Sequence, residues 1–291
     1  MKGEENLWRI LGDKFEMLRA AERWPEALRV AATALELARR AFPENHPSLA
    51  LSYERLAQIH DHCGQRAEAK PYLAKALDIM EQIEPADQRA IYRIARRLAC
   101  LCDAAREDKE AIIFYEKAIA AANQAENARR TELGTMLNNL ALIYRRSGRQ
   151  KAAEPYYLQA LELYEKELGP HHPDVAAVLN NLGVFYINEG ELEKAEQMHE
   201  RALAIRRRVH PRGHPDVAQS HCNLAVVYHS RGDLKRAAEL YRESLRGWEE
   251  VESPTEDYQI VAANYADLLR SLGKKRKAAT IEARARKRAG L

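Results

Sequence analysis

The feature that most constrains this chain is a repeat of 42 residues. The segment His-Pro-Asp-Val-Ala begins at His172 and again at His214, and the column formed by Gly148, Gly190 and Gly232 has the same spacing. Each of these glycines ends a run of the form Asn-Leu-(Ala/Gly)-x-x-Tyr-x-x-x-Gly. A period of this length is typical of a solenoid, because a single unit cannot bury its apolar face and neighbouring units must stack.

One unit is predicted to be a helical hairpin. Pro173 suits the first turn of a helix, where a missing N–H costs nothing, and Asp174 favours the positive end of the helix dipole. Apolar residues then recur every three to four positions from Val175 to Tyr186, which places them on one helix face. Gly190 ends that helix, and a second helix is expected to follow it.

Small residues seven positions apart mark the second helix of every unit. They lie on one face of that helix, where they allow two backbones to approach closely. The first of the two positions is held by Ala27, Ala69, Ala111, Ala153, Ala195, Ala237 and Ala278, and the second by Ala34, Ala76, Ala118, Ala160, Ala202, Ser244 and Ala285. Seven hairpins are therefore predicted, near residues 5–42, 43–84, 85–126, 127–169, 170–211, 212–252 and 253–291. The expected fold is all-α, a right-handed superhelical solenoid that forms one domain over residues 1–291.

Composition and cysteine spacing indicate the class of protein and its cellular compartment. With 46% hydrophobic and 31% charged residues, the composition fits a soluble helical protein. The four cysteines are Cys63, Cys100, Cys102 and Cys222, and they form neither CxxC pairs nor the paired Cys/His spacing of a zinc site. No apolar run approaches the roughly 18 residues that span a bilayer, and the first residues lack the apolar core of a signal peptide. We therefore expect a reduced, cytoplasmic protein without a bound metal.

Catalytic motifs are missing from the sequence. There is no HExxH, no glycine loop that would cradle a phosphate and no nucleophile elbow, so we expect neither enzymatic activity nor a cofactor. The histidines at His172 and His214 have a structural interpretation as residues that precede helix starts.

The repeat units resemble those of a known family. Helices with Leu-x-x-Leu-Ala-x-x-Tyr in the first position and small residues in the second resemble the tetratricopeptide repeat (TPR) over nearly the whole chain. The 42-residue unit is similar to the kinesin light chain version, most clearly in 137–144, 153–157 and 172–186. Kinesin light chains carry a heptad coiled coil ahead of their repeats, whereas this sequence starts its first hairpin within ten residues of Met1. It is therefore identified as similar to the stand-alone bacterial kinesin light chain proteins that accompany bacterial tubulins.

The resemblance implies a concave surface that is lined by the first helix of each hairpin. In such arrays the asparagine nine residues before the turn glycine faces this groove, which here corresponds to Asn139, Asn181, Asn223 and Asn264. An asparagine amide offers two donors and an acceptor, so a row of them can hold the backbone of an extended peptide. The alternative is that these amides bond neighbouring helices.

Arginines are expected at the neighbouring inward positions of the second to fourth units. They are Arg55, Arg93, Arg96, Arg97, Arg145 and Arg146. Six guanidiniums in a concavity would focus a positive potential, which predicts an acidic ligand such as the tail of a tubulin-like protein. The alternative is an ordinary solvated face, on which each ion pair contributes about 0 to 1 kcal/mol.

The fifth and sixth units differ, because apolar residues occupy the inward positions. These residues are Val184, Ile187, Cys222 and Val226. A groove that is basic at one end and apolar at the other would suit a peptide with both kinds of residue. Core packing of the four side chains is the alternative.

The last predicted helix is strongly basic, although the whole chain has a net charge of only +3. Its cations are Lys274, Lys275, Arg276, Lys277, Arg284, Arg286, Lys287 and Arg288. They would suit an anionic membrane surface or an acidic protein tail, with nucleic acid the least favoured partner. The alternative is a charged cap on the open end of the array.

The sequence therefore predicts a non-catalytic adaptor for protein–protein interaction. Its expected partner is a protein with an acidic segment, and a bacterial tubulin-like filament is the specific candidate. The alternative function is a peripheral membrane tether or scaffold that acts through the basic C-terminal helix.

Overall fold

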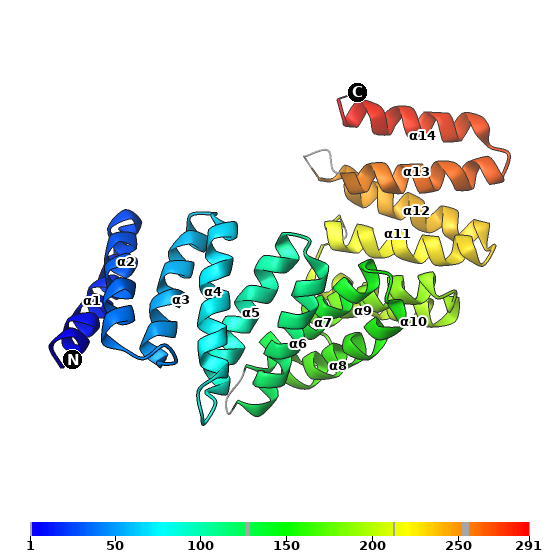
Figure 1. Ribbon diagram of the computed structural model, residues 1–291. Coiled ribbons are helices and arrows are strands. Elements are labelled where there is room, and N and C mark those ends of the chain that lie inside the picture. The colour runs from blue at the N-terminus through cyan, green and yellow to red at the C-terminus, as the bar shows by residue number, and fades with distance from the viewer. Residues whose placement is uncertain (1, 126–128, 212, 252–255, 291) are drawn as a thin grey trace. The chain divides into compact units, whose positions relative to one another are not determined.

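The protein is an all-α repeat solenoid, as predicted. The computed structural model describes residues 2–125, 129–211, 213–251 and 256–290. In this part of the chain there are fourteen α-helices and no strands (Figure 1). They are α1 (Lys2–Ala20), α2 (Trp24–Ala41), α3 (Pro47–His62), α4 (Arg66–Glu81), α5 (Gln88–Ala104), α6 (Asp108–Gln124), α7 (Arg130–Arg146), α8 (Gln150–Leu168), α9 (Pro173–Asn188), α10 (Leu192–Val209), α11 (Pro215–Ser230), α12 (Leu234–Glu249), α13 (Glu256–Ser271) and α14 (Lys275–Arg288). The helices fall two by two into the seven predicted ranges.

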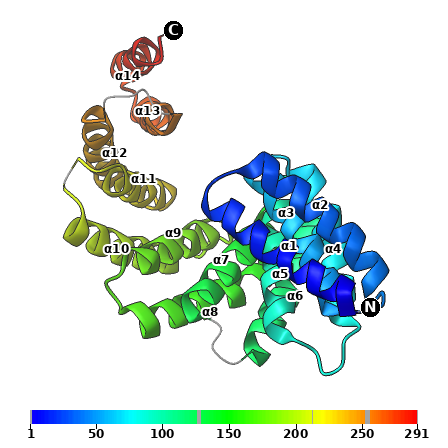
Figure 2. The same cartoon turned by 90° about the vertical axis from the view of Figure 1, so that its left-hand side faces the viewer.

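The helices group into two compact units. Unit 1 is Met1–Ser147 and contains α1 to α7, and unit 2 is Gly148–Leu291 and contains α8 to α14. Within each unit every helix packs on its neighbours in sequence, and in unit 2 α11 also contacts both α9 and α13. Helices α9, α11 and α13 are the first helices of their pairs, so the first helices of unit 2 lie against one another. Figure 2 shows the last pair, α13 and α14, side by side.

Three helices, α3, α9 and α11, begin with a His-Pro pair whose histidine caps the helix. The Nδ1 atoms of His46, His172 and His214 each accept a hydrogen bond from the backbone N–H two residues later, at 3.1 to 3.2 Å. The cap satisfies one of the N–H groups that have no partner inside the helix. The predicted starts at the His-Pro-Asp segments are therefore confirmed, and the histidine rather than the aspartate supplies the cap.

The turn between the two helices of a pair uses a left-handed residue. Five pairs place glycine there, with φ between 72° and 83°. They are Gly64, Gly148, Gly190, Gly232 and Gly273. Two pairs have a residue with a side chain at the same position, Glu22 with φ of 56° and Arg106 with φ of 60°. A side chain in this conformation costs roughly 1–2 kcal/mol.

Replacing Glu22 by glycine is therefore expected to raise the free energy of unfolding by about 1 kcal/mol, because glycine adopts positive φ without a steric penalty. The reverse change, Gly232→Ala, should lower it by a similar amount. Urea denaturation of both variants checks the pair of predictions. A loss of stability in the Glu22→Gly variant would contradict this account of the turn.

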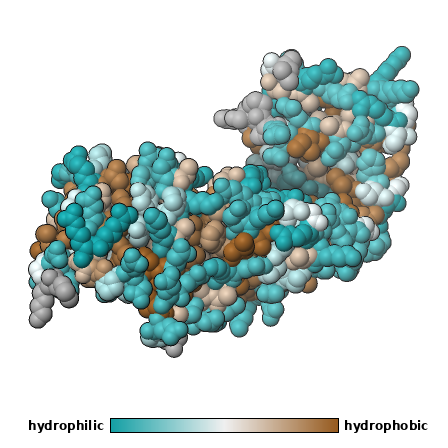
Figure 3. Space-filling model, in the orientation of Figure 1, coloured by the Kyte–Doolittle hydropathy of each residue, from teal (hydrophilic) through white to brown (hydrophobic). Residues whose placement is uncertain are grey.

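Close helix packing rests on the predicted small residues. All of those at the first position are fully buried, and those at the second position are 0% exposed except Ala285, at 7%. The surface side chains are mainly hydrophilic on the faces of both units that Figure 3 shows. No helix in the described residues is long and apolar enough to cross a membrane.

From the third to the sixth pair, one buried position of the 42-residue period holds an aromatic ring, which is tyrosine in three pairs and histidine in the fifth. Tyr115, Tyr157 and Tyr241 are 0 to 1% exposed, and His199 occupies the same position in the fifth pair, also at 0%. Neither ring nitrogen of His199 has a hydrogen-bond partner among the described residues. Burial lowers the pKa of His199 to about 4. The ring lies against Gly183, where an added Cβ would be 2.4 Å from Cε1 of the imidazole.

Candidate partner-binding site

The first helices of unit 1 are joined by ion pairs that cross from one pair of helices to the next. Arg93 in α5 donates to both carboxylate oxygens of Glu54 in α3, through Nε at 2.9 Å and Nη2 at 2.7 Å. These hydrogen bonds raise the pKa of Arg93, against the effect of its burial. Glu54 is only 7% exposed, so this pair is part of the helix interface as well as of the surface.

Two further arginines of α5 are paired in the same way. Nη2 of Arg97 lies 3.8 Å from Oδ2 of Asp61 in α3, and Nε of Arg96 lies 3.9 Å from Oε2 of Glu132 in α7. Glu132 also accepts a hydrogen bond of 2.5 Å from the hydroxyl of Tyr92. Burial, with this hydrogen bond as the second cause, raises the pKa of Tyr92 to about 12.

Arg146, at the end of α7, has two carboxylate partners. Its Nη1 lies 2.7 Å from Oδ1 of Asp103, and its Nη2 and Nε donate to Oδ1 of Asp108 at 2.5 and 2.9 Å. The guanidinium holds the pKa of Asp108 below its usual value and has its own pKa raised in return. These contacts tie the end of α7 to the turn between α5 and α6.

The remaining two predicted arginines are partly enclosed. Arg55 is 12% exposed in its side chain, and its guanidinium lies over the rings of Trp8 and Phe15 at 5.5 and 5.4 Å. The Nε atom of Arg145 is buried and has no hydrogen-bond partner among the described residues. Because five of the six arginines have a carboxylate within 4.0 Å, the positive potential of this surface is smaller than six charges alone would produce.

Replacing Arg93 by alanine is expected to lower the free energy of unfolding by about 1–2 kcal/mol. The change removes both hydrogen bonds of the buried Glu54 carboxylate. Removal of one partner from a fully buried ion pair costs about 3–5 kcal/mol. Arg93 is half-exposed, so solvent reduces that cost. The measurement is urea denaturation of the Arg93→Ala variant. The control is Arg89→Ala, which removes an exposed arginine of the same helix. Equal losses in the two variants would contradict the role of the pair.

One cavity brings two of the predicted residues together. It has a volume of about 360 Å³ and lies among α5, α6 and α7, within unit 1. We call it the Asn139 cavity, and its lining consists of Cys100, Asp103, Ala104, Arg106, Tyr115, Asn139 and Arg146.

The Asn139 cavity has a polar floor and a basic rim. The Asn139 amide donates to the Tyr115 hydroxyl at 3.3 Å, and the Cys100 sulfur lies 3.8 Å from the same oxygen. Arg106 is exposed at the turn between α5 and α6. An asparagine offers two donors and an acceptor, and among the described residues the Asn139 amide uses one of the donors for Tyr115.

The asparagines of unit 2 bond mainly to other side chains. The Asn223 amide donates to Oδ1 of Asn180 at 2.6 Å and accepts from Gln219 at 2.9 Å. Asn264 forms a side-chain hydrogen bond with Cys222. Asn181 is half-buried. The amides of Asn223 and Asn264 therefore connect neighbouring first helices of unit 2, and the Asn139 amide bonds α6 in unit 1, which is the alternative that the sequence left open.

The apolar inward residues of unit 2 contribute to its core. Cys222 is 3% exposed and belongs to the buried cluster of α11 to α14, with Val226 packed against that cluster. Burial raises the pKa of the Cys222 thiol to about 12. Val184 and Ile187 are half-buried. Core packing therefore accounts for Cys222 and Val226.

The basic terminal helix α14 is a packed helix with an exposed cationic surface. Ala278 and Ala285 bury one face, and Arg288 donates to the carbonyl oxygens of Trp248, at 3.0 Å, and of Val251. The other seven predicted cations are exposed, and they are Lys274, Lys275, Arg276, Lys277, Arg284, Arg286 and Lys287. Arg288 and the ion pair of 3.0 Å between Arg284 and Glu249 thus hold α14 to the end of α12, and the other six predicted cations are exposed.

Sequence reasoning missed the carboxylates that pair with the arginines and most of the lining of the Asn139 cavity. Tyr115 could have been found, because it occupies the same position of the 42-residue period as Tyr157 and Tyr241. The partners Glu54 and Asp61 lie 39 and 36 residues before their arginines. These unequal spacings depart from the 42-residue period, so the repeat alone does not reveal them.

Comparison with known proteins places this architecture in context. The profile described as Tetratricopeptide repeat matches residues 16–82, 132–208, 174–250 and 216–289. Among solved structures, BtubC (BKLC) from P. vanneervenii is 29% identical with a TM-score of 0.59, over 78% of this chain and 91% of that one. A Podosopora anserina putative kinesin light chain with nearly identical TPR-like repeats is 23% identical with a TM-score of 0.55, over 71% and 98%. YrrB, a TPR protein with an unusual peptide-binding site, is 20% identical with a TM-score of 0.53, over 74% and 92%. No curated protein matches the chain.

Proposed function

We propose, from the premise that this chain belongs to the tetratricopeptide repeat family, that it is a cytoplasmic, non-catalytic adaptor that binds an acidic segment of another protein. Proteins of this family mediate protein–protein interactions. The observation that carries the proposal is the Asn139 cavity, where an amide, a phenol, a carboxylate and two arginines line one depression formed by α5, α6 and α7 of unit 1.

The chemistry of the Asn139 cavity suits an extended acidic peptide. Asn139 would hydrogen-bond a peptide group of the ligand, and the exposed Arg106 would pair with one of its carboxylates. Arg146 would take part by sharing its guanidinium between the ligand and Asp103. A volume of about 360 Å³ accepts one aromatic side chain of the ligand as an anchor.

A bacterial tubulin-like filament is the partner that we propose. Its support is the likeness to BtubC, a bacterial kinesin light chain, at 29% identity over most of both chains. An acidic tail on such a filament would present many copies of the ligand at high local concentration, so that weak single contacts would suffice.

Co-sedimentation with a polymerised bacterial tubulin-like protein tests this function. The variant Arg96→Glu/Arg106→Glu reverses the charge of Arg106 in the cavity lining and of Arg96 one turn before Cys100 on α5, and it keeps the Arg93–Glu54 pair. We expect it to pellet at least about tenfold more weakly than the unaltered chain, because like charges in an interface repel. The variant Arg276→Glu/Lys277→Glu in α14 is the matched charge control. Loss in the α14 variant alone, or in neither, would contradict binding at the cavity.

A peripheral membrane tether is the second candidate, favoured by the exposed cations at Lys274 and along α14. Clustered lysines and arginines near an anionic bilayer contribute about 1 kcal/mol each. We expect the chain to float with vesicles that contain phosphatidylserine and to be released by 0.5 M salt. Lys274→Gln/Lys275→Gln/Lys277→Gln should weaken flotation and leave α14 packed through Arg288. Equal flotation with neutral vesicles would argue against the tether.

A further inference from the structure

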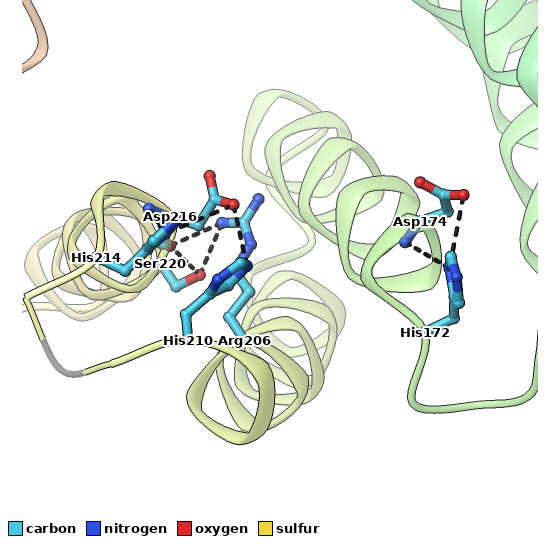
Figure 4. Close-up of polar contacts among 7 residues, drawn as sticks. All are labelled: His172, Asp174, Arg206, His210, His214, Asp216 and Ser220. Atoms are coloured by element: carbon cyan, nitrogen blue, oxygen red, sulfur yellow. Dashed lines mark hydrogen bonds and ion pairs between the residues drawn. The ribbon is translucent and has the colours of Figure 1, made fainter.

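The loop between α10 and α11 holds a cluster of potential metal ligands in unit 2. His210, His214 and Asp216 each offer a ligand atom, and these atoms lie within 4.8 Å of one another (Figure 4). Nε2 of His210 is 3.6 Å from Oδ2 of Asp216, and Nδ1 of His214 is 3.9 Å from the same oxygen. The two imidazole rings are stacked, with their centroids 3.7 Å apart.

The preceding repeat provides an internal comparison. His172 and Asp174 stand 42 residues before His214 and Asp216, and they have the same cap and a similar contact of 3.5 Å. The residue 42 positions before His210 is Leu168, which has no ligand atom. Figure 4 shows His172 and Asp174 at the start of α9, and His210 of the α10 end together with His214 and Asp216 of the α11 start. Among the described residues, the group of three potential ligands is the one at His210, His214 and Asp216.

We propose that His210, His214 and Asp216 form a binding site for a divalent transition-metal ion of the zinc class. Imidazole nitrogen and carboxylate oxygen are ligands of Zn²⁺, with bonds of about 2.0–2.2 Å, and three protein ligands commonly leave a fourth position to water. Ligand atoms of a tetrahedral site then lie about 3.3 Å apart. The two histidine–carboxylate distances of 3.6 and 3.9 Å exceed this value by a few tenths of an ångström, and all three ligand atoms lie within 4.8 Å of one another, so binding requires the two stacked rings to turn towards the ion. The ligands are 25 to 50% exposed in their side chains, so an ion can reach them.

Binding must replace the helix cap at His214. Its Nδ1 atom now accepts the N–H of Asp216 at 3.2 Å, and the same lone pair would bind the ion. The metal bonds would then connect the end of α10 to the start of α11. The bound ion would therefore link two hairpins of unit 2 at their connection. It would replace the hydrogen bond that the backbone N–H of Asp216 donates to His214.

The nearby cation Arg206 hydrogen-bonds the backbone of Asp216, and its charge also attracts the Asp216 carboxylate. Its Nη1 donates to the backbone oxygen of Asp216 at 3.0 Å and to Oγ of Ser220 at 2.8 Å. These bonds hold the guanidinium to the first turns of α11. Among the described residues, the ion-pair contacts of the Asp216 carboxylate are those with the two histidines.

Isothermal titration of the full chain with ZnCl₂, in a buffer that does not bind metal, tests the site. We expect one ion to bind per chain. His210→Leu, which installs the residue found at the corresponding position 168, should weaken binding by at least about 10- to 100-fold, because the loss of supporting groups outside the ligand set already costs that much. His172→Asn, in the repeat without a third ligand, is the matched control and should bind as the unaltered chain does.

A check of the fold separates the loss of a ligand from damage by mutation. Circular dichroism verifies that each variant is folded, and Asp216→Asn, which keeps the His214 cap, is a second loss-of-ligand variant. Equal zinc binding by the unaltered chain, His210→Leu and Asp216→Asn, or no binding by any of them, would overturn the proposal.

Discussion

Lowering the pH from 7.5 to 5 is expected to reduce the free energy of unfolding by about 2 kcal/mol through one residue, His199. Its imidazole is fully buried with no hydrogen-bond partner among the described residues, and its pKa is about 4 instead of 6.5. At a pH between 4 and 6.5, the imidazole of His199 is protonated in the unfolded chain and neutral in the folded chain. Stability from this group is therefore complete above pH 6.5 and is lost as the pH falls towards 4, to a total of about 3 kcal/mol.

The variant His199→Tyr isolates this effect from all other titrating groups. It installs the residue that Tyr115 and Tyr241 provide in other repeats, and it does not titrate between pH 4 and 8. Urea denaturation at pH 7.5 and pH 5 should show a larger loss in the unaltered chain than in the variant, by about 2 kcal/mol. The same pH dependence in both proteins would show that His199 is not the group responsible.

Replacing Gly183 by alanine is expected to destabilise the protein by about 1–3 kcal/mol, although alanine is the better helix former. An added Cβ would lie 2.4 to 2.7 Å from three atoms of the His199 ring, which is buried and has little room to move. The corresponding residues of neighbouring repeats are Ala141 and Ala225, so alanine fits this position when the facing residue is different.

A double-mutant cycle measures the dependence of the two positions on each other. Gly183→Ala combined with His199→Tyr recreates the pairing of Ala225 with Tyr241 in the next repeat. We therefore expect the double variant to be more stable than Gly183→Ala alone, with a coupling energy of at least about 1 kcal/mol from thermal or urea denaturation. Additive effects would indicate that the close approach of Gly183 and His199 has no energetic consequence.

The fold was predictable because each hairpin repeats the same physical solution. Proline and its preceding histidine start the first helices, glycine allows the left-handed turn, and the small residues at positions such as Ala195 and Ala237 permit close packing. Each repeat carries the same residue types at the same positions, so the evidence for a helical hairpin increases with the number of repeats. The predicted tetratricopeptide repeat is likewise confirmed by the family profile, and the predicted likeness to kinesin light chain proteins agrees with the similarity to BtubC and to the Podosopora anserina protein.

The candidate site was less predictable because it depends on residues that differ from one repeat to the next. Arg93 and Arg146 were placed correctly on the first helices, but their carboxylate partners come from neighbouring helices at unequal spacings. The role of each asparagine depends on one neighbour: Asn139 meets the Tyr115 hydroxyl, whereas Asn223 meets Asn180. A single sequence does not specify such contacts between side chains, since they follow from helix packing.

The most direct test of the proposed binding surface uses the thiol of Cys100, which is exposed and lines the Asn139 cavity. Cys63 is also exposed but lies outside that lining, so it is an internal control. Burial raises the pKa of Cys102 to about 11 and that of Cys222 to about 12, which keeps both as slowly reacting thiols.

Alkylation rates of the two exposed thiols, read by mass spectrometry with and without a saturating glutamate-rich peptide that contains one tryptophan, provide the measurement. We predict that the peptide slows the alkylation of Cys100 at least about fivefold and leaves that of Cys63 unchanged, because a bound ligand covers only the first of them. Unchanged alkylation of Cys100 would contradict binding in the cavity.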